Sequence, residues 1–450
     1  MNSGAGPSGR ARPARVRHPG DGEPPARLRQ ALDSLAARPI EVTDKGFGAL
    51  AARGTVTVAS LAAARPPLFG GDFMPPLLVL RDSALRHNAL AMADWCARAG
   101  VLLAPHGKTT MAPQLFARQI AAGAWGMTVA TVGQAQVCRA FGIGRVLIAN
   151  ELADPAGIGW LAGQLADPGW ECYAYVDSAA GVELLGAALR AGGAPRPLPV
   201  LVELGFPGGR TGCRTVAEAL AVAAAVAGED ALALAGAAGY EGGLGAGGSR
   251  AGLDAVAAWC ARLRELAGRL PGEPPDGRRA WIVSAGGSAY PDVVARELTA
   301  GGDHAAEVVL RSGCYLTHDH GEYARTGPDA RGAGPGLVPA IEVWAPVLSR
   351  PEPGLALACA GRRDVPFDKG LPVPLRLRRA DGAVVPADGI AVTGLDDQHA
   401  YLSVPAGAGA GPGDLICLGI SHPCTAFDKW RLIPVVDDEY RVIDAVRTFF

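Results

Sequence analysis

The feature of this sequence that most restricts its fold is a regular alternation of short apolar runs with alanine-rich stretches between residues 76 and 331. Strands followed by helices in this way are typical of a parallel sheet. Eight runs have the length and composition of strands: 101–105, 127–131, 145–149, 172–177, 198–204, 233–239, 281–285 and 307–311. Eight such units predict an α/β fold, a closed (β/α)8 barrel of the TIM type, with the earlier run 77–80 outside it.

The pattern changes after about Gly332, where helical periodicity ends. Short Val-, Leu- and Ile-containing runs are then broken by Pro and Gly, at 338–348, 355–360, 373–379, 390–394, 400–404 and 415–420. These runs predict a second, mainly β domain over 332–450. Residues 31–75 contain strand-like runs at 40–42 and 56–58, and we expect this segment to pack with the β domain. Residues 1–30 are rich in Gly, Pro and Arg, which predicts a disordered tail.

Charge and cysteine usage exclude several classes of protein. With 42 basic and 44 acidic residues, the formal charge is -2, so a basic surface for nucleic acid is not expected. No run of 18 or more apolar residues indicates a membrane span. Nine cysteines without paired spacing favour a reducing cytoplasm. The partner that we expect is a small molecule.

Lys108 lies where the first barrel strand ends and the next helix is expected to begin, in the run Ala104-Pro105-His106-Gly107-Lys108-Thr109-Thr110. A lysine at the C-terminal end of a barrel strand can hold a carbonyl compound as an imine, whereas an ordinary surface lysine is disfavoured at a helix N-terminus. Later strands are followed by Arg210, Tyr240, the loop Gly286-Gly287-Ser288 and the loop Ser312-Gly313-Cys314-Tyr315. Because the last two loops are glycine-rich, their backbone N–H groups can approach a phosphate closely. Each of these features also has a purely structural alternative. The glycine-rich loops could be plain tight turns, Arg210 a surface arginine and Tyr240 a core tyrosine.

The β domain contains a candidate metal clamp in Ser421-His422-Pro423-Cys424. Alternate residues of an extended segment point to one side, so His422 and Cys424 can bind one ion together. Imidazole and thiolate ligands favour zinc, and two protein ligands leave open positions, as a catalytic site requires. A buried pair without metal is the alternative. A second candidate is His318-Asp319-His320. Neighbouring residues of a strand point to opposite faces, so the three cannot all reach one ion, although His318 and His320 alone could. We expect them to support the site or to contact substrate, with their roles left open.

These segments resemble the D-serine dehydratase and D-threonine aldolase branch of the pyridoxal phosphate enzymes with an alanine racemase-type barrel, known as fold type III. The resemblance runs from about Pro76 to the C-terminus. The opening motif of the family reads Arg-Pro-His-x-Lys-Thr-His-Lys. This chain keeps Pro105, His106, Lys108 and Thr109 and has Ala104, Thr110 and Met111 at the other three positions.

The resemblance implies a role for each candidate residue. Lys108 would carry pyridoxal phosphate as an imine and His106 would position it, while Arg210 and Tyr240 would lie beside the cofactor ring. The phosphate contacts would come from Gly286, Gly287, Ser288, Ser312, Gly313, Cys314 and Tyr315. His422 and Cys424 would bind Zn²⁺, and the cysteine is the ligand of the dehydratase branch, whereas the aldolase branch has an aspartate.

The function implied is a zinc-assisted β-elimination of a D-3-hydroxy amino acid such as D-serine or D-threonine, which gives a 2-oxo acid and ammonia. The alternative within the family is metal-dependent retro-aldol cleavage of the same substrates. A cofactor carrier without turnover and a zinc hydrolase without pyridoxal phosphate are the alternatives from other classes. We also expect a homodimer, because active sites of this family are often completed at a dimer interface.

Overall fold

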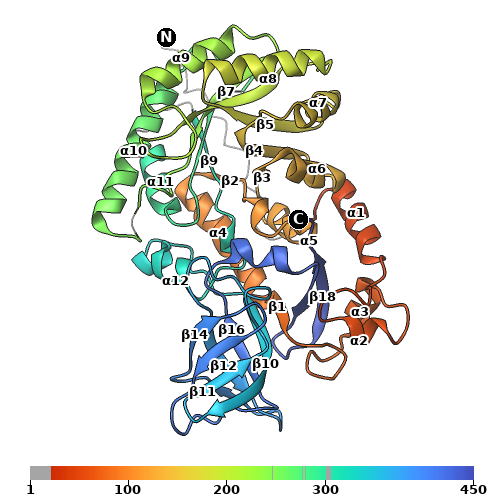
Figure 1. Cartoon of the computed structure of the whole chain (residues 1–450). Helices are drawn as coiled ribbons and strands as arrows, with labels where there is room; N and C mark the ends of the chain where they lie inside the picture. The colour runs from red at the N-terminus through yellow and green to blue at the C-terminus, as the bar shows by residue number, and fades with distance from the viewer. Residues whose placement is uncertain (1–21, 246, 276, 279, 301–305) are drawn as a thin grey trace, which may run out of the picture.

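The computed structural model describes residues 22–245, 247–275, 277–278, 280–300 and 306–450. Figure 1 shows two parts, a helix-covered barrel and a narrower β domain beneath it. The fold is the predicted parallel barrel with a separate, mainly antiparallel β domain, as in the alanine racemase-like fold.

Eight parallel strands form the barrel, and every predicted barrel strand is confirmed. They are β2 (Leu102–Leu103), β3 (Met127–Val129), β4 (Arg145–Glu151), β5 (Glu171–Val176), β6 (Leu198–Leu204), β7 (Leu232–Gly239), β8 (Trp281–Ala285) and β9 (Ala306–Leu310). Their hydrogen-bonded order is β2-β9-β8-β7-β6-β5-β4-β3. A parallel bridge between His106 and Thr128 joins the two end strands, so the residue next to the Lys108 turn helps to close the sheet.

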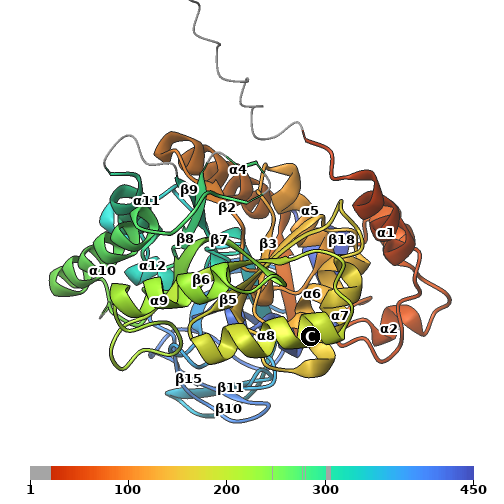
Figure 2. The same ribbon diagram turned by 90° about the horizontal axis from the view of Figure 1, so that it is seen from above.

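A ring of helices surrounds these strands, as the view from above shows (Figure 2). The helices are α4 (Asp82–Ala99), α5 (Pro113–Ala121), α6 (Val132–Ala140), α7 (Pro155–Gln164), α8 (Ala179–Ala191), α9 (Val216–Ala227), α10 (Arg250–Gly268) and α11 (Pro291–Thr299). Several begin at a side chain that accepts a backbone N–H bond, as at Thr131, Ser178 and Ser249. In α9, Thr215 and Glu218 form a reciprocal capping box. Local sequence therefore fixes where these helices start, and with them where the strand-end loops lie.

The barrel is filled rather than hollow. Leu147, Tyr173, Leu201, Ile282 and Val309 form a buried cluster of strand residues. Each comes from a different strand, and the layered filling of a barrel by side chains from several strands is typical of this architecture. Chemistry is therefore confined to the strand ends, where the loops open.

The β domain contains ten strands of the described chain. They are β1 (Leu77–Arg81), β10 (Ile341–Glu352), β11 (Leu355–Ala358), β12 (Val373–Arg378), β13 (Val384–Pro386), β14 (Ala391–Leu395), β15 (Ala400–Ser403), β16 (Leu415–Gly419), β17 (Leu432–Val436) and β18 (Val442–Arg447). β1 precedes the barrel in sequence but is hydrogen-bonded between β10 and β17. The run 77–80 is thus outside the barrel, as predicted, although it was grouped with the barrel in the range 76–331.

The N-terminal segment folds into the helices α1 (Ala26–Ala36), α2 (Gly48–Ala51) and α3 (Val58–Ala64). The part from Ile40 onward packs on the β domain, with α3 next to β18 (Figure 1), whereas α1 contacts α5 of the barrel. The strands predicted at 40–42 and 56–58 are wrong, because only one isolated bridge joins this region, between Pro39 and Thr57. The tail predicted for 1–30 is too long, since α1 begins at Ala26, and residues 1–21 lie outside the described part of the chain.

The segment between barrel and β domain contains short helical turns, namely η2 (Cys314–Leu316), α12 (Glu322–Thr326) and η3 (Asp329–Arg331). Among the described helices, none combines the length and hydropathy needed to span a membrane.

Candidate active site

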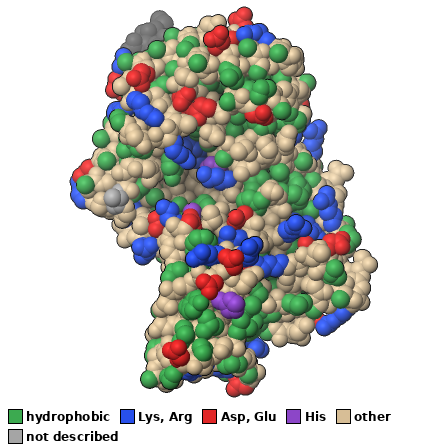
Figure 3. All heavy atoms as spheres, in the orientation of Figure 1, with side chains coloured by type: hydrophobic (Ala, Val, Ile, Leu, Met, Phe, Trp, Pro, Cys, Tyr) green, Lys and Arg blue, Asp and Glu red, His purple; other side chains and the backbone are tan. Residues whose placement is uncertain are grey.

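Lys108 lies in the short 3-10 turn η1 (Gly107–Thr109), directly after β2. The helix predicted to start at the lysine begins only at Pro113, so the lysine is held in a tight turn instead. Its side chain lines a cavity of about 240 Å³ at the C-terminal end of the barrel, and the cavity walls include His106, Arg210, Tyr240, Gly287 and Arg311. Figure 3 shows basic side chains and a histidine gathered in a hollow between the barrel and the β domain.

The cavity favours the neutral forms of Lys108 and His106. Burial lowers the pKa of Lys108, and the charges of Arg210 and Arg311 lower it further, against the opposing effect of Cys424 and Cys314. Burial and the charge of Lys108 hold the pKa of His106 well below its usual range. The Nδ1 atom of His106 is buried without a hydrogen-bond partner among the described residues, so it is free to meet a bound group.

Arg210 and Tyr240 lie side by side, with the guanidinium carbon 4.6 Å from the centre of the tyrosine ring. Both line the cavity of Lys108, which is where the sequence analysis expected them. Burial raises the pKa of Tyr240, and the neighbouring carboxylate of Glu241 raises it further. Tyr240 therefore keeps its proton near neutral pH and is available as a hydrogen-bond donor.

Arg311 is a cavity residue that the sequence analysis missed. It follows β9 directly, is 5% exposed, and donates to the Ser284 hydroxyl (2.8 Å) and the Gly239 carbonyl (2.6 Å). These bonds tie the ends of three neighbouring strands together. A charged residue directly after the apolar run Val308-Val309-Leu310 was the signal that could have found it.

Three carboxyl groups lie close together beside the same cavity. The nearest oxygens of Glu151, Asp177 and Glu203 are all within 4.8 Å of one another. Burial, together with the charges of Glu203 and Asp177, raises the pKa of Glu151 to about 9. Glu151 is therefore protonated at neutral pH, which removes part of the repulsion within the group.

The glycine-rich loop after β8 is hydrogen-bonded to a carboxylate that the sequence analysis did not identify. The N–H groups of Gly286 and Gly287 donate to the buried carboxylate of Glu241, at 3.1 and 2.7 Å. The prediction left these groups free for a phosphate, but Glu241 already occupies them. Gly286 and Gly287 are 45 and 46 positions from Glu241 in sequence, and neighbouring strands bring them together.

The loop after β9 approaches the lysine turn very closely. An added Cβ at Gly313 would lie 2.5 Å from the His106 carbonyl oxygen and 2.8 Å from Thr109 Oγ1, so only glycine fits. The two loops are joined where the Cys314 N–H donates to Ser288 Oγ, at 3.2 Å. Within the described residues, the backbone N–H groups of Ser288 and Gly313 have no hydrogen-bond partner. Both groups are therefore available to a bound ligand.

Ser312 and Tyr315, two other predicted phosphate contacts, have structural partners. The Ser312 hydroxyl donates to the carbonyl groups of Gly286 and Gly287. Tyr315 is 4% exposed and packs in the main hydrophobic core. The neighbouring Cys314 has different surroundings, since its sulfur contacts the sulfur of Cys424.

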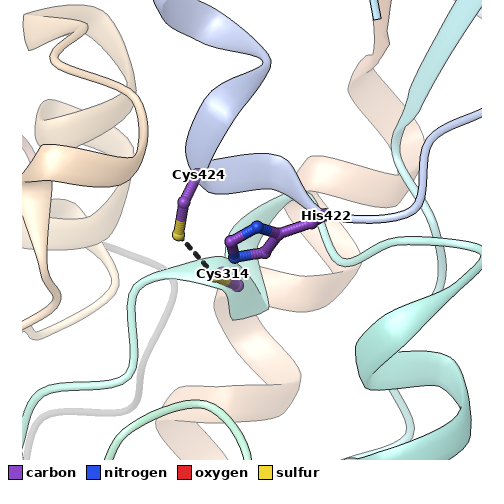
Figure 4. Close-up of side chains that lie close together, drawn as sticks. All are labelled: Cys314, His422 and Cys424. Carbon is purple, nitrogen blue, oxygen red and sulfur yellow. Dashed lines mark hydrogen bonds between the residues drawn. The ribbon is translucent and has the colours of Figure 1, made fainter. Parts of the chain in front are cut away.

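Cys314 was expected to contact a phosphate, but its side chain lies with His422 and Cys424 in the candidate metal clamp. The ligand atoms of Cys314, His422 and Cys424 are all within 4.8 Å of one another, and the two sulfur atoms are 3.2 Å apart. Figure 4 shows the three side chains converging from η2 of the barrel and from the segment of η4 (Pro423–Thr425) in the β domain. The structure thus brings the side chains of His422 and Cys424 together, and the sulfur of Cys314 is a third donor atom beside them.

Asp368 orients the clamp. Its carboxylate lies 2.7 Å from Nδ1 of His422 and also accepts a bond from the Thr425 hydroxyl at 2.8 Å. Burial lowers the pKa of His422, but contacts with Cys424 and Asp368 outweigh burial and raise it to about 9. The hydrogen bond with Cys314 holds the pKa of the Cys424 thiol well below its usual range, with His422 acting in the same direction.

The neighbouring His318, Asp319 and His320 are not part of this clamp. Asp319 accepts bonds from the N–H groups of Gly321 and Tyr323, so it fixes the start of α12. His318 is buried and His320 is partly buried, and burial lowers the pKa of His320 to about 4. We assign these three residues to the support of the loop.

Two family models match the two parts of the chain. The alanine racemase N-terminal domain matches residues 81–290, and the putative serine dehydratase domain matches residues 340–436. A D-threonine aldolase of an Arthrobacter species is 29% identical over 378 residues, which cover 83% of this chain and 93% of the relative. Both parts of the chain are thus similar to fold type III pyridoxal phosphate-dependent lyases. The resemblance found in the sequence is therefore confirmed.

Solved structures of the family have the same architecture. The D-threonine aldolase from Filomicrobium marinum is 27% identical and superposes with a TM-score of 0.71, covering 84% of this chain and 95% of that one. The D-threo-3-hydroxyaspartate dehydratase from Delftia sp. HT23 has a TM-score of 0.63 at 22% identity, with coverages of 84% and 97%. Both comparisons support the same two-part fold for this chain.

The three departures from the family motif are all buried in this chain. Ala104 belongs to the cluster inside the barrel, Met111 to the main core, and Thr110 is 4% exposed. Ala104 and Met111 carry no polar side-chain group, so these two positions need no hydrogen-bond partner inside the protein. The retained His106 and Lys108 are the two that line the cavity.

Proposed function

We propose that this enzyme eliminates the β-hydroxyl group of a D-3-hydroxy amino acid such as D-serine or D-threonine, to give a 2-oxo acid and ammonia. The observation that carries the proposal is the clamp of Cys314, His422 and Cys424 beside the turn that holds Lys108. A metal at this place serves a reaction at the β-carbon, whereas racemisation at the α-carbon does not need one.

The described residues fit pyridoxal phosphate. Lys108 offers a buried amine of lowered pKa, and Arg210 and Tyr240 line the same cavity. The free N–H groups of Ser288 and Gly313 are available to a phosphate, while Gly286 and Gly287 shape the loop through Glu241. When bound, the cofactor withdraws electrons from the α-carbon of the substrate.

The residues of the chain then have separate tasks. The Nζ atom of Lys108, in its neutral form, accepts the α-proton of the substrate. Arg210 holds the substrate carboxylate or the ring oxygen of the cofactor in its planar fork. His106, kept neutral by burial, orients the lysine turn, and the closed lower barrel excludes water from one side.

The clamp fits zinc by its chemistry. Imidazole and thiolate donors select zinc over magnesium or calcium, and Asp368 holds the histidine as outer-shell carboxylates do at zinc sites. Zinc lowers the pKa of a bound hydroxyl or water from about 15.7 towards roughly 7 to 9, which makes hydroxide a better leaving group. Cysteine as the second ligand supports elimination, because the aldolase branch has aspartate there.

Retro-aldol cleavage is the second candidate, and it has support of its own. The Arthrobacter relative and the Filomicrobium structure are both D-threonine aldolases, at 29% and 27% identity. A cofactor carrier without turnover or a zinc hydrolase without pyridoxal phosphate fits less well with a lysine cavity next to a metal clamp. Visible absorbance of the purified protein would exclude the hydrolase.

Product analysis with D-threonine distinguishes the two reactions. Elimination converts D-threonine into 2-oxobutanoate and ammonia, whereas retro-aldol cleavage gives glycine and acetaldehyde. We expect the first pair of products, and no turnover of L-threonine. Glycine and acetaldehyde in equal amounts, without ammonia, would establish the aldolase instead.

The proposal extends to the oligomeric state and the cellular compartment of the enzyme. We expect a homodimer, which light scattering of the purified protein tests. The clamp needs reduced thiols, and all nine cysteines are free in the described structure, which supports a reducing compartment such as the cytoplasm.

A further inference from the structure

The clamp contains one more candidate ligand than the pair recognised in the sequence. His422 and Cys424 belong to the β domain, whereas Cys314 comes from η2, directly after the last strand of the barrel. We propose that Cys314 is a third protein ligand of the metal, so that the site has two thiolates and one imidazole and joins the two parts of the enzyme. This inference rests on the proposed metal at His422 and Cys424.

Distances within the clamp support one shared ion. Two sulfur atoms bound to one zinc at about 2.3 Å each cannot be more than about 4.6 Å apart. The sulfur atoms of Cys314 and Cys424 are 3.2 Å apart, and no ligand atom of the three is more than 4.8 Å from another. Small side-chain adjustments are therefore enough to place all three donors around an ion.

The position of Cys314 is fixed by its backbone. Its N–H donates to Ser288 Oγ at 3.2 Å, and the preceding Gly313 allows the close approach to the lysine turn. Its side chain is 3% exposed, and its sulfur has Cys424 as its hydrogen-bond neighbour within the described chain. A buried thiol directed at a second thiol and an imidazole is placed for coordination rather than for packing.

The remaining cysteines provide the contrast. Cys96, Cys138, Cys172 and Cys260 are buried among apolar side chains of the core. Among the described residues, the metal-compatible groups are this clamp and the three carboxyl groups at Glu151. Cys314 thus differs from the core cysteines in its neighbours and not merely in its burial.

The third ligand changes the expected chemistry. Two protein ligands leave two positions of a tetrahedral ion open, whereas three leave a single one, as in catalytic zinc sites. That one position would take the β-hydroxyl group of the substrate. Two thiolates also strengthen the preference for zinc over Mn²⁺ or Mg²⁺, because soft ligands suit zinc and hard oxygen ligands suit the other two.

The test counts the sulfur ligands of the metal. Metal-free holoenzyme is loaded with Co²⁺, and the near-ultraviolet sulfur-to-cobalt absorbance is measured as a difference spectrum per bound cobalt. Cys314→Ser should still bind cobalt, with the charge-transfer intensity reduced to about half, since one of two thiolates is lost. Cys359→Ser, which removes a half-buried thiol outside the clamp, should match the unmodified enzyme.

A second measurement uses the unmodified enzyme, so its result does not depend on whether a variant folds. X-ray absorption of the zinc-loaded, unmodified enzyme should show two sulfur neighbours of the metal. One sulfur neighbour, or an unchanged cobalt spectrum in Cys314→Ser, would overturn the role of Cys314 while leaving the pair His422 and Cys424 intact. Failure of the unmodified enzyme to bind either metal, or loss of two titratable thiols to a Cys314 to Cys424 disulfide, would instead overturn the metal site itself.

Discussion

The hydroxyl group of Thr109 lies 3.5 Å from the sulfur of Cys424. The turn that carries Lys108 is therefore in contact with the metal clamp, although the two residues are 315 positions apart in the sequence. Under the proposed function, the cofactor and the metal are held on the two sides of this contact.

Replacing Lys108 with alanine should abolish visible cofactor absorbance and turnover without unfolding the protein, because the cavity tolerates a smaller side chain. Borohydride reduction of the unmodified enzyme, followed by peptide mapping, should label Lys108. The chain has only four lysines, so the assignment is unambiguous. Lys369→Ala, at an exposed lysine, serves as the control and should keep its absorbance. Labelling of any other lysine would remove Lys108 from its central role.

Gly313→Ala should weaken cofactor binding and cost about 1–3 kcal/mol of unfolding free energy, because the new Cβ would collide with the His106 carbonyl and Thr109. Pyridoxal phosphate titration and urea unfolding measure the two effects. The matched control is Gly354→Ala, where an added Cβ meets no atom within 4 Å. Equal behaviour of the two variants would show that the close approach of the loops is unimportant.

Asp368→Asn should lower zinc affinity by roughly 10- to 100-fold, the usual effect of removing a carboxylate that orients a metal-bound histidine. Chelator competition gives the affinity. The half-exposed Asp428, which makes no contact with His422, provides the control Asp428→Asn. If Asp368→Asn retains the affinity of the unmodified enzyme, the carboxylate does not position the ligand.

Glu151 should make stability depend on pH. Its pKa in the folded protein is about 9, compared with an ordinary value of 4.5, so the folded state binds the proton more tightly than the unfolded state. This contribution is fully present below about pH 4.5 and is lost as the pH rises towards about 9. Glu151→Gln should remove that part of the slope, measured as urea midpoints at about pH 6 and about pH 8. An identical slope in both proteins would contradict the raised pKa.

The barrel could be predicted because its evidence is local. Each strand is a short apolar run, each helix has its own cap, and their alternation implies the parallel order. The N-terminal strands failed for the converse reason. Apolar runs such as 40–42 are compatible with several local structures, and it is packing of Phe47 and Phe73 against the β domain that selects turns and helices there.

The site was only partly predictable. Lys108, His422 and Cys424 lie in distinctive local motifs, and the structure places the lysine in a cavity at the strand ends and the other two next to each other. Glu241, Asp368 and Arg311 act through contacts to segments 27 to 72 residues away, so no local pattern shows them. Cys314 was assigned to the phosphate loop because the sequence shows which strand it follows, but not which side of the turn its sulfur faces.

The most direct measurement of the central claim compares elimination with α-proton exchange in Cys424→Ala. Oxo-acid formation from D-serine, α-deuterium exchange and zinc content are measured in the variant and in the unmodified enzyme. If the clamp serves departure of the hydroxide, the variant should lose zinc and elimination while Lys108 still supports exchange at the α-carbon. Full elimination activity in a zinc-free Cys424→Ala enzyme would contradict the account and leave the clamp a structural feature.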